Sequence, residues 1–224
     1  MTKGVIPQIL PSTKAWLILV AVIGAAVVLV WVSPQERSLG SGIKFVYVHV
    51  SLTWAGMAGF TAAGVMGAVL TFIDHPRLPA WQESTTWVAL TWFTVGVAMA
   101  MLAAKINWGA IHWKEPLLVA SLRFLAAALL VQIAKRWLIS GRLRGALDVL
   151  LAFFLMWSIL GTPQVMHPQS PIRQSSSLAI QLTFLGMFIL SSLAAAWTVW
   201  QFRRFFTTEP RGNKHTRVKF LQRT

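Results

Sequence analysis

Three of the five histidines lie where an imidazole ring could bind a metal ion: His49, His112 and His167. His49 lies in the apolar stretch FVYVHVSLTW, and His167 lies between Pro163 and Pro168. A neutral imidazole is a good ligand for haem iron, and the fixed φ angles of proline would hold His167 in place. His49 and His167 are therefore candidates for two axial haem ligands. The alternative is that both are ordinary histidines hydrogen-bonded to neighbouring loops.

A short segment between these two histidines in the sequence is rich in tryptophan. Residues 105–116 read KINWGAIHWKEP, with Trp108 and Gly109 forming an expected turn and Trp113 following it. Indole rings offer flat apolar surface on which a planar porphyrin can stack. His112 lies in the same loop and is a further candidate ligand. The alternative is an aromatic belt at the membrane surface.

Two arginines could bind the carboxylates of a porphyrin. Arg173 follows His167 by six residues, so its guanidinium could pair with a propionate on the same side. Arg123 lies inside an apolar segment, where a charge is costly and by default functional. Its side chain could reach a propionate or extend along the helix to the membrane surface.

Several classes of function are excluded by composition. The chain has no cysteine, so it has no disulfide, thiolate ligand or thiol redox chemistry. The formal net charge of +14 does not indicate nucleic-acid binding, because the densest basic stretch is the tail at 203–224, directly after an apolar segment. No nucleophile–base pair is evident on the side that carries the three histidines, so we do not expect an enzyme.

The elements that must position these residues are membrane spans. Of the 224 residues, 56% are hydrophobic and 12% are charged, whereas soluble domains carry about twice that charge. Apolar runs of about 18 residues are long enough to cross a bilayer as helices. The six expected spans are 15–32, 45–73, 85–103, 117–133, 146–161 and 178–202. The sequence thus predicts one domain over 1–224, an all-α integral membrane bundle whose first span is retained rather than cleaved as a signal peptide.

The orientation of this bundle follows from the distribution of Lys and Arg. Fourteen of the twenty lie in the N-terminal segment, the second–third and fourth–fifth connections and the tail, and five lie on the other side. The excess marks the cytoplasmic side, so both termini are expected in the cytoplasm and the protein in a plasma or inner membrane. The connections 33–44, 105–116 and 162–177 then face outward, together with the three histidines.

Two other features are expected to be structural. Ala55, Gly59, Ala63 and Gly67 form a ladder of small residues at four-residue steps, which is typical of close helix packing in membranes. Asp148 falls near the start of the fifth span, where a carboxylate would interact favourably with the helix dipole.

Three of these motifs together resemble a known family. The stretch YVHVSLTW, from Tyr47 to Trp54, resembles the Tyr-x-His-Val-Pro-Ser-x-Trp motif of the CcmC and CcsA haem-handling proteins of cytochrome c maturation. The segment 108–115 resembles a degenerate form of their tryptophan-rich WWD loop. His167-Pro168 matches their later external histidine. The resemblance covers about 45–200, and six spans with both termini inside is the CcmC architecture.

The resemblance implies a function and a site. His49 and His167 would be axial ligands of a transiently held haem b, and Trp54 would join the loop residues Trp108, Gly109 and Trp113 in the platform for the ring. The protein would deliver haem at the outer membrane face to a haem chaperone, an ABC-type release complex or apocytochrome c. The alternatives are a CcsA-like haem-attachment (synthase) subunit, and a transporter or scaffold that binds no haem.

Overall fold

A computed structural model describes residues 13–73, 75–138, 140–163 and 175–207, and over these the chain forms helices and no strand. Each of the six helices is long and apolar enough to cross a membrane, which confirms the predicted all-α, multi-pass architecture. The helices are α1 (Thr13–Trp31), α2 (Ile43–Phe72), α3 (Leu78–Trp108), α4 (Pro116–Lys135), α5 (Gly141–Leu160) and α7 (Leu178–Thr207).

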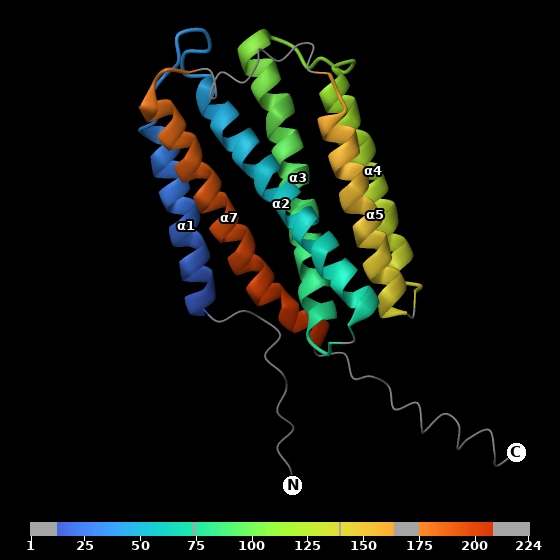
Figure 1. Ribbon diagram of the computed structural model, residues 1–224. Helices are drawn as coiled ribbons and strands as arrows, with labels where there is room; N and C mark the ends of the chain where they lie inside the picture. Colours follow the sequence, from blue (N-terminus) through green and yellow to red (C-terminus); the bar gives the residue numbers. More distant parts are fainter. Residues whose placement is uncertain (1–12, 74, 139, 164–174, 208–224) are drawn as a thin grey trace, which may run out of the picture.

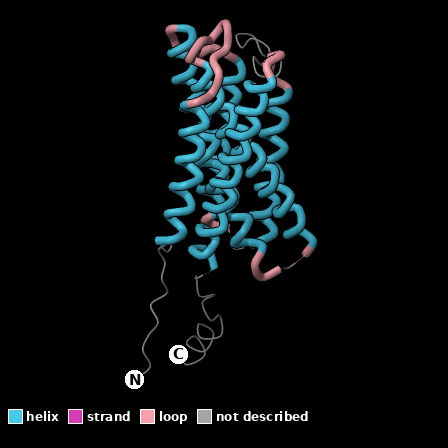
Figure 2. The backbone as a smooth tube through the Cα atoms, turned by 90° about the vertical axis from the view of Figure 1, so that its left-hand side faces the viewer, coloured by secondary structure: helices cyan, strands magenta, loops and turns pink. Residues whose placement is uncertain are grey.

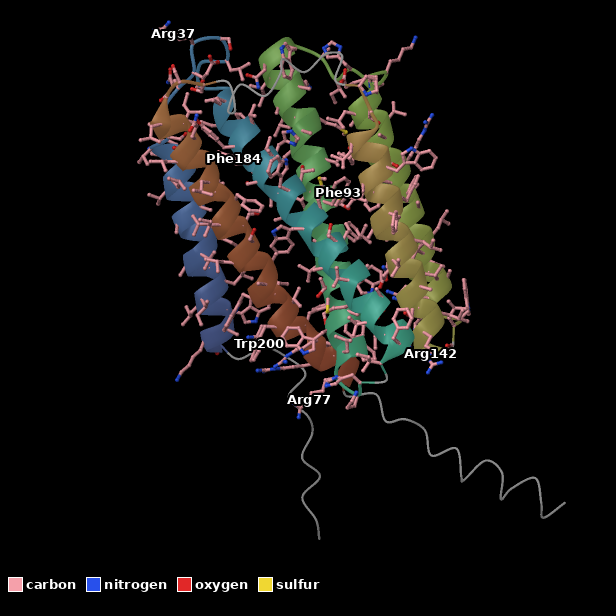
Figure 3. The ribbon with its side chains drawn as sticks, viewed as in Figure 1. Arg37, Arg77, Phe93, Arg142, Phe184 and Trp200 are labelled. Carbon is pink, nitrogen blue, oxygen red and sulfur yellow. The ribbon has the colours of Figure 1, made fainter. Side chains whose placement is uncertain are left out.

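The helices lie side by side and alternate in direction, so that both ends of the chain emerge at one end of the bundle (Figure 1). We call this the terminal end, and the opposite end, where α2, α4 and α7 begin, the distal end. Figure 2 shows that the helix axes follow the long axis of the bundle. Arg77 and Arg142 lie at the terminal end and Arg37 at the distal end (Figure 3). The connections therefore alternate as the sequence predicts.

The centre of the bundle is α2, which packs against α3, α5 and α7 (Figure 1). Three rings join α2, α3 and α4 edge to face. The Phe60 ring centroid lies 4.9 Å from that of Phe124, and Phe93 lies 5.2 Å from Phe124. A second buried cluster, which includes Tyr47 and Met187, joins α2 to α7. These contacts fix α2, and therefore His49, relative to its neighbours.

Helix α1 lies at the edge of the bundle, mainly against α7 (Figure 1). Ala15 is its buried residue, and the indole N–H of Trp197 donates to the Ala15 carbonyl at 3.0 Å. Gly186 of α7 faces Leu29, and a Cβ at Gly186 would lie 2.9 Å from a Leu29 methyl carbon. Ala26, Leu29 and Val30 pack against the buried cluster of α2 and α7, and most other residues of α1 are exposed apolar residues that would face lipid.

The small residues of α2 make the predicted close contacts, but with two different helices. A Cβ at Gly59 would lie 2.8 Å from the Cβ of Ala89 in α3. A Cβ at Gly67 would lie 2.4 Å from the carbonyl oxygen of Gly145 in α5. Glycine is therefore required for α2 and α5 to approach this closely, and the ladder separates into a part that faces α3 and a part that faces α5.

The largest difference from the predicted spans is α3, which extends beyond 85–103 at both ends. Hydropathy misses its polar first turns, where Gln82 and Ser84 are buried against protein rather than lipid. Pro79 lies in the first turn of α3, where the missing N–H costs no helical hydrogen bond. Trp108 is the last residue of α3 rather than part of a loop.

Candidate functional site

A contact between the Asn107 side chain and the backbone at Gly42 holds the distal end together. The side-chain amide of Asn107 donates to the carbonyl of Gly42 at 3.3 Å and to that of Ala103 at 2.9 Å. A Cβ at Gly42 would overlap the Asn107 side chain, since it would lie 1.9 Å from its oxygen. This pair fixes the start of α2 against the end of α3. Sequence reasoning missed it, because an isolated Gly and Asn carry no sign of which helices are neighbours.

His49 is half-buried between α2 and α3, and its tautomer is set by a carbonyl. Its Nδ1 lies 3.3 Å from the carbonyl oxygen of Gly96. A carbonyl can only accept, so Nδ1 carries the proton and donates it. The lone pair then lies on Nε2, and metal-binding histidines are commonly oriented by such a second hydrogen bond. The hydroxyl of Thr53 donates to the His49 carbonyl at 2.7 Å, and its oxygen lies 3.4 Å from Nδ1.

Gly96 makes this arrangement possible. A Cβ at Gly96 would lie 2.8 Å from the backbone nitrogen of Thr53, well inside van der Waals contact. A larger residue would therefore push α3 away from α2 and lengthen the hydrogen bond to the His49 ring. Gly96 is a positioning residue that sequence reasoning did not identify.

The Trp-rich segment forms a short turn between α3 and α4. Gly109 has a φ of +78°, and its N–H donates to the carbonyl of Lys105 at 3.0 Å, so a glycine ends α3 in the left-handed conformation. Trp108 and Trp113 flank this turn and are 40% and 60% exposed. Half-buried His112 accepts a backbone hydrogen bond from Glu115 at 2.9 Å. The turn thus presents two indoles at the distal end.

Trp54 and Arg123 lie away from this turn. Trp54 packs edge-on against Phe184 and Phe188 of α7, at centroid distances of 5.6 and 6.2 Å. It follows His49 by five residues, which places it about 140° around α2. Arg123 is exposed on α4, off the buried stripe that contains Phe124. Its exposed side chain is accessible to a carboxylate from outside the bundle.

The second predicted ligand, His167, and the predicted propionate partner Arg173 lie outside the described residues. The pairing of His49 with His167 therefore stays a prediction.

The connection from α1 to α2 carries an ionised carboxylate at the distal end. Glu36 accepts hydrogen bonds from the Ser38 hydroxyl, from the Ser38 N–H at 2.8 Å and from the Leu39 N–H at 2.9 Å. The Ser38 hydroxyl first, and the Leu39 N–H next, lower the pKa of Glu36. Because hydrogen bonds to the charged form favour ionisation, Glu36 keeps its negative charge at neutral pH.

A buried charge cluster lies near the terminal end. The ammonium of Lys135 lies 2.9 Å from a carboxylate oxygen of Glu83 and 2.9 Å from one of Asp148. The same Asp148 oxygen accepts from the Gln82 amide at 2.9 Å and from the Thr86 hydroxyl at 3.2 Å. The side chains of Lys135 and Asp148 are each 1% exposed. The cluster therefore joins α3, α4 and α5 through the protein interior.

This cluster corrects two expectations. Asp148 lies seven residues after Gly141, the first residue of α5, whereas the helix dipole acts within the first turn. Its partner is Lys135, so its assignment to the dipole was wrong. Lys135 follows the predicted span 117–133 and was therefore expected in the fourth–fifth connection, but it lies in the last turn of α4 and is buried in the bundle. The polar residues Gln82, Glu83 and Thr86, spaced along one face of α3, were the available signal.

No protein-family model matches this chain, and no curated protein is significantly similar to it. The resemblance to the CcmC and CcsA proteins therefore rests on the three motifs, on their order and on the six spans.

Proposed function

We propose that this protein binds haem and delivers it at the outer membrane face during cytochrome c maturation. The observation that carries the proposal is the hydrogen bond from His49 Nδ1 to the Gly96 carbonyl, which assigns the metal-binding lone pair to Nε2. It occurs in a helix that is fixed by aromatic packing on several sides. A ligand oriented in this way needs little rearrangement to bind iron.

The exposed indoles of the distal end support haem as the cargo. Trp108 and Trp113 are exposed at the end of the bundle where α2 begins, and stacking on indole suits a large planar ring. In this proposal His167 is the second axial ligand, as in the family that the motifs resemble. Arg173 and Arg123 are candidates for the two propionates, and His112 is a further candidate ligand. The haem is held transiently and passed on.

The orientation belongs to the same proposal. Among the described residues, most Lys and Arg side chains lie at the terminal end, including Arg77 and Arg142 (Figure 3), and basic residues favour the cytoplasmic side. The distal end then faces outward from a plasma or inner membrane. There the partners would be a haem chaperone, an ABC-type release complex or apocytochrome c. Since the chain has no cysteine, reduction of the apocytochrome is left to another protein.

The test is the absorption spectrum of the detergent-purified protein, oxidised and reduced. We expect a low-spin bis-imidazole spectrum in the oxidised form. His49→Ala and His167→Ala each open one axial position, so each variant should become high-spin or lose haem. Added imidazole is a small neutral ligand and should restore the low-spin spectrum in both.

The control is His112→Ala, which should leave the spectrum unchanged. A spectrum abolished by His112→Ala but retained by His167→Ala would identify His112 as the second ligand and contradict the pairing. A wild-type protein without haem, even after expression with haem in excess, would favour a transporter or scaffold. Covalent attachment of haem to apocytochrome by the purified protein would indicate the CcsA-like synthase alternative instead.

A further inference from the structure

A groove with a volume of about 390 Å³ lies near the terminal end, between α3, α7 and the residue that follows α4. Helix α3 contributes Trp87 and Trp92, and α7 contributes Phe202 and Phe206. Arg136, directly after α4, completes the lining. The volume is within the range of about 300–1,000 Å³ that is typical of ligand sites. The residues of the proposed haem site and of the buried charge cluster do not line this groove.

The walls of the groove are apolar because their polar groups bond elsewhere. The indole N–H of Trp87 donates to Glu83 and that of Trp92 to the Ser191 carbonyl, both at 3.2 Å. Two threonines of the lining, Thr91 and Thr198, donate to carbonyls of their own helices at 3.0 and 2.8 Å. The rings and methyl groups that remain offer contact to a hydrocarbon chain and little to water.

Arg136 supplies the charge of the groove. Its guanidinium lies 5.9 Å from the centroid of the Trp87 ring, and it is exposed. The nearby carboxylate of Glu83 is bound by Lys135 and by the Trp87 indole. Among the described residues, Arg136 makes no ion pair. Its planar set of N–H donors is suited to binding a phosphate group.

We propose that this groove is a binding site for an anionic phospholipid, with one acyl chain against the aromatic walls and the phosphate on Arg136. The groove is lined by α3 and α7, two helices long and apolar enough to span a bilayer, which would supply hydrocarbon chains. A single cation in an otherwise apolar and uncharged lining matches a hydrocarbon chain that carries a negative headgroup. The site lies at the terminal end, whose basic residues attract anionic lipids from the adjoining leaflet.

The test compares lipids retained by the detergent-purified protein, measured by native mass spectrometry after addition of phosphatidylglycerol or phosphatidylcholine. We expect phosphatidylglycerol to be retained in preference. Arg136→Gln should lower its retention about fivefold, the effect of one basic residue at an anionic membrane. Thr198→Trp and Thr91→Phe should fill the groove and reduce the retention of phosphatidylglycerol with Arg136 present. Arg142→Gln, an exposed arginine at the same end, is the matched control.

Three results would overturn the proposal. Equal retention of the two lipids would show a groove without headgroup selection. Glycerol phosphate that competes fully with the lipid would show that the chain plays no part. Unchanged retention in Arg136→Gln, with circular dichroism and gel filtration showing a folded protein, would show that the arginine does not bind the headgroup. Haem content reports on the distal end separately and should be the same in all of these variants.

Discussion

At the scale of single residues, Lys135 is the buried cation that pairs with two carboxylates. Its ammonium serves two carboxylates, of which Asp148 is fully enclosed and Glu83 is 18% exposed. Burial of ions is costly, and a buried pair need not stabilise a protein more than apolar residues of the same size. Removing one partner is different, because it leaves a charge enclosed without a counter-charge.

We therefore expect Lys135→Met to lower the free energy of unfolding in detergent by about 3–5 kcal/mol. The double variant Lys135→Met/Asp148→Asn should recover part of this loss, since the asparagine carries no charge and can still accept from Gln82 and Thr86. Denaturant titration followed by circular dichroism measures the change. Exposed Arg142→Met is the control and should alter stability little. A Lys135→Met protein as stable as the wild type would mean that Asp148 is not ionised.

The exposed indole at the end of α3 gives a second residue-scale prediction. Trp108→Ala should lower haem retention partly while leaving the protein folded, because ring stacking contributes only about 1 kcal/mol beyond area burial. Haem content per protein, from absorbance, is the measurement. Trp137→Ala is a suitable control, because Trp137 is also exposed but follows α4 at the terminal end. If Trp108→Ala retained as much haem as Trp137→Ala, Trp108 would be part of an aromatic belt at the membrane surface and not of the haem platform.

At the scale of elements, the spans were predictable because a bilayer admits few structures. Any helix that crosses it needs a long apolar run, and such runs are visible in the sequence. The start of α3 was not predictable in this way, since the polar side chain of Gln82 is buried and donates to Asp148 of another helix. The same holds for His49. Its residue type suggested a ligand, but its hydrogen bond to Gly96 depends on which helices are neighbours.

The crossing of α2 and α5 is the element-scale test. Gly67→Ala places a methyl group against the Gly145 carbonyl and near the Gln82 amide, so it should separate the helices and weaken the bond from Gln82 to Asp148. Overpacking of this kind costs about 1–3 kcal/mol, which thermal unfolding in detergent would show.

The matched control is Gly24→Ala in α1, where nothing lies within 4 Å of the added Cβ. This variant should be neutral or slightly more stable, because alanine is the better helix former. Equal effects of the two substitutions would argue against close contact of α2 with α5.

At the scale of the whole molecule, the prediction concerns topology. Reporter fusions at both ends of the bundle would measure which end faces the cytoplasm. Cytoplasmic signals are expected after Lys14, Arg77, Gly141 and Arg211, and external signals near Gly40, Ala110 and Gln169. A cytoplasmic signal at Gln169 would remove His167 from the outer face and contradict the proposed haem site. The alternation of α1 to α7 makes the result a single choice between two orientations (Figure 1).

The edge position of α1 has a consequence for biosynthesis. A ribosome completes α1 early, but the helix against which it packs, α7, is made last. At about 5–20 residues per second, α1 waits on the order of ten seconds before Trp197 is available to bond the carbonyl of Ala15. During that interval α1 lacks its main partner and packs only against α2. The first of the six helices to be made is thus among the last to be packed into the bundle.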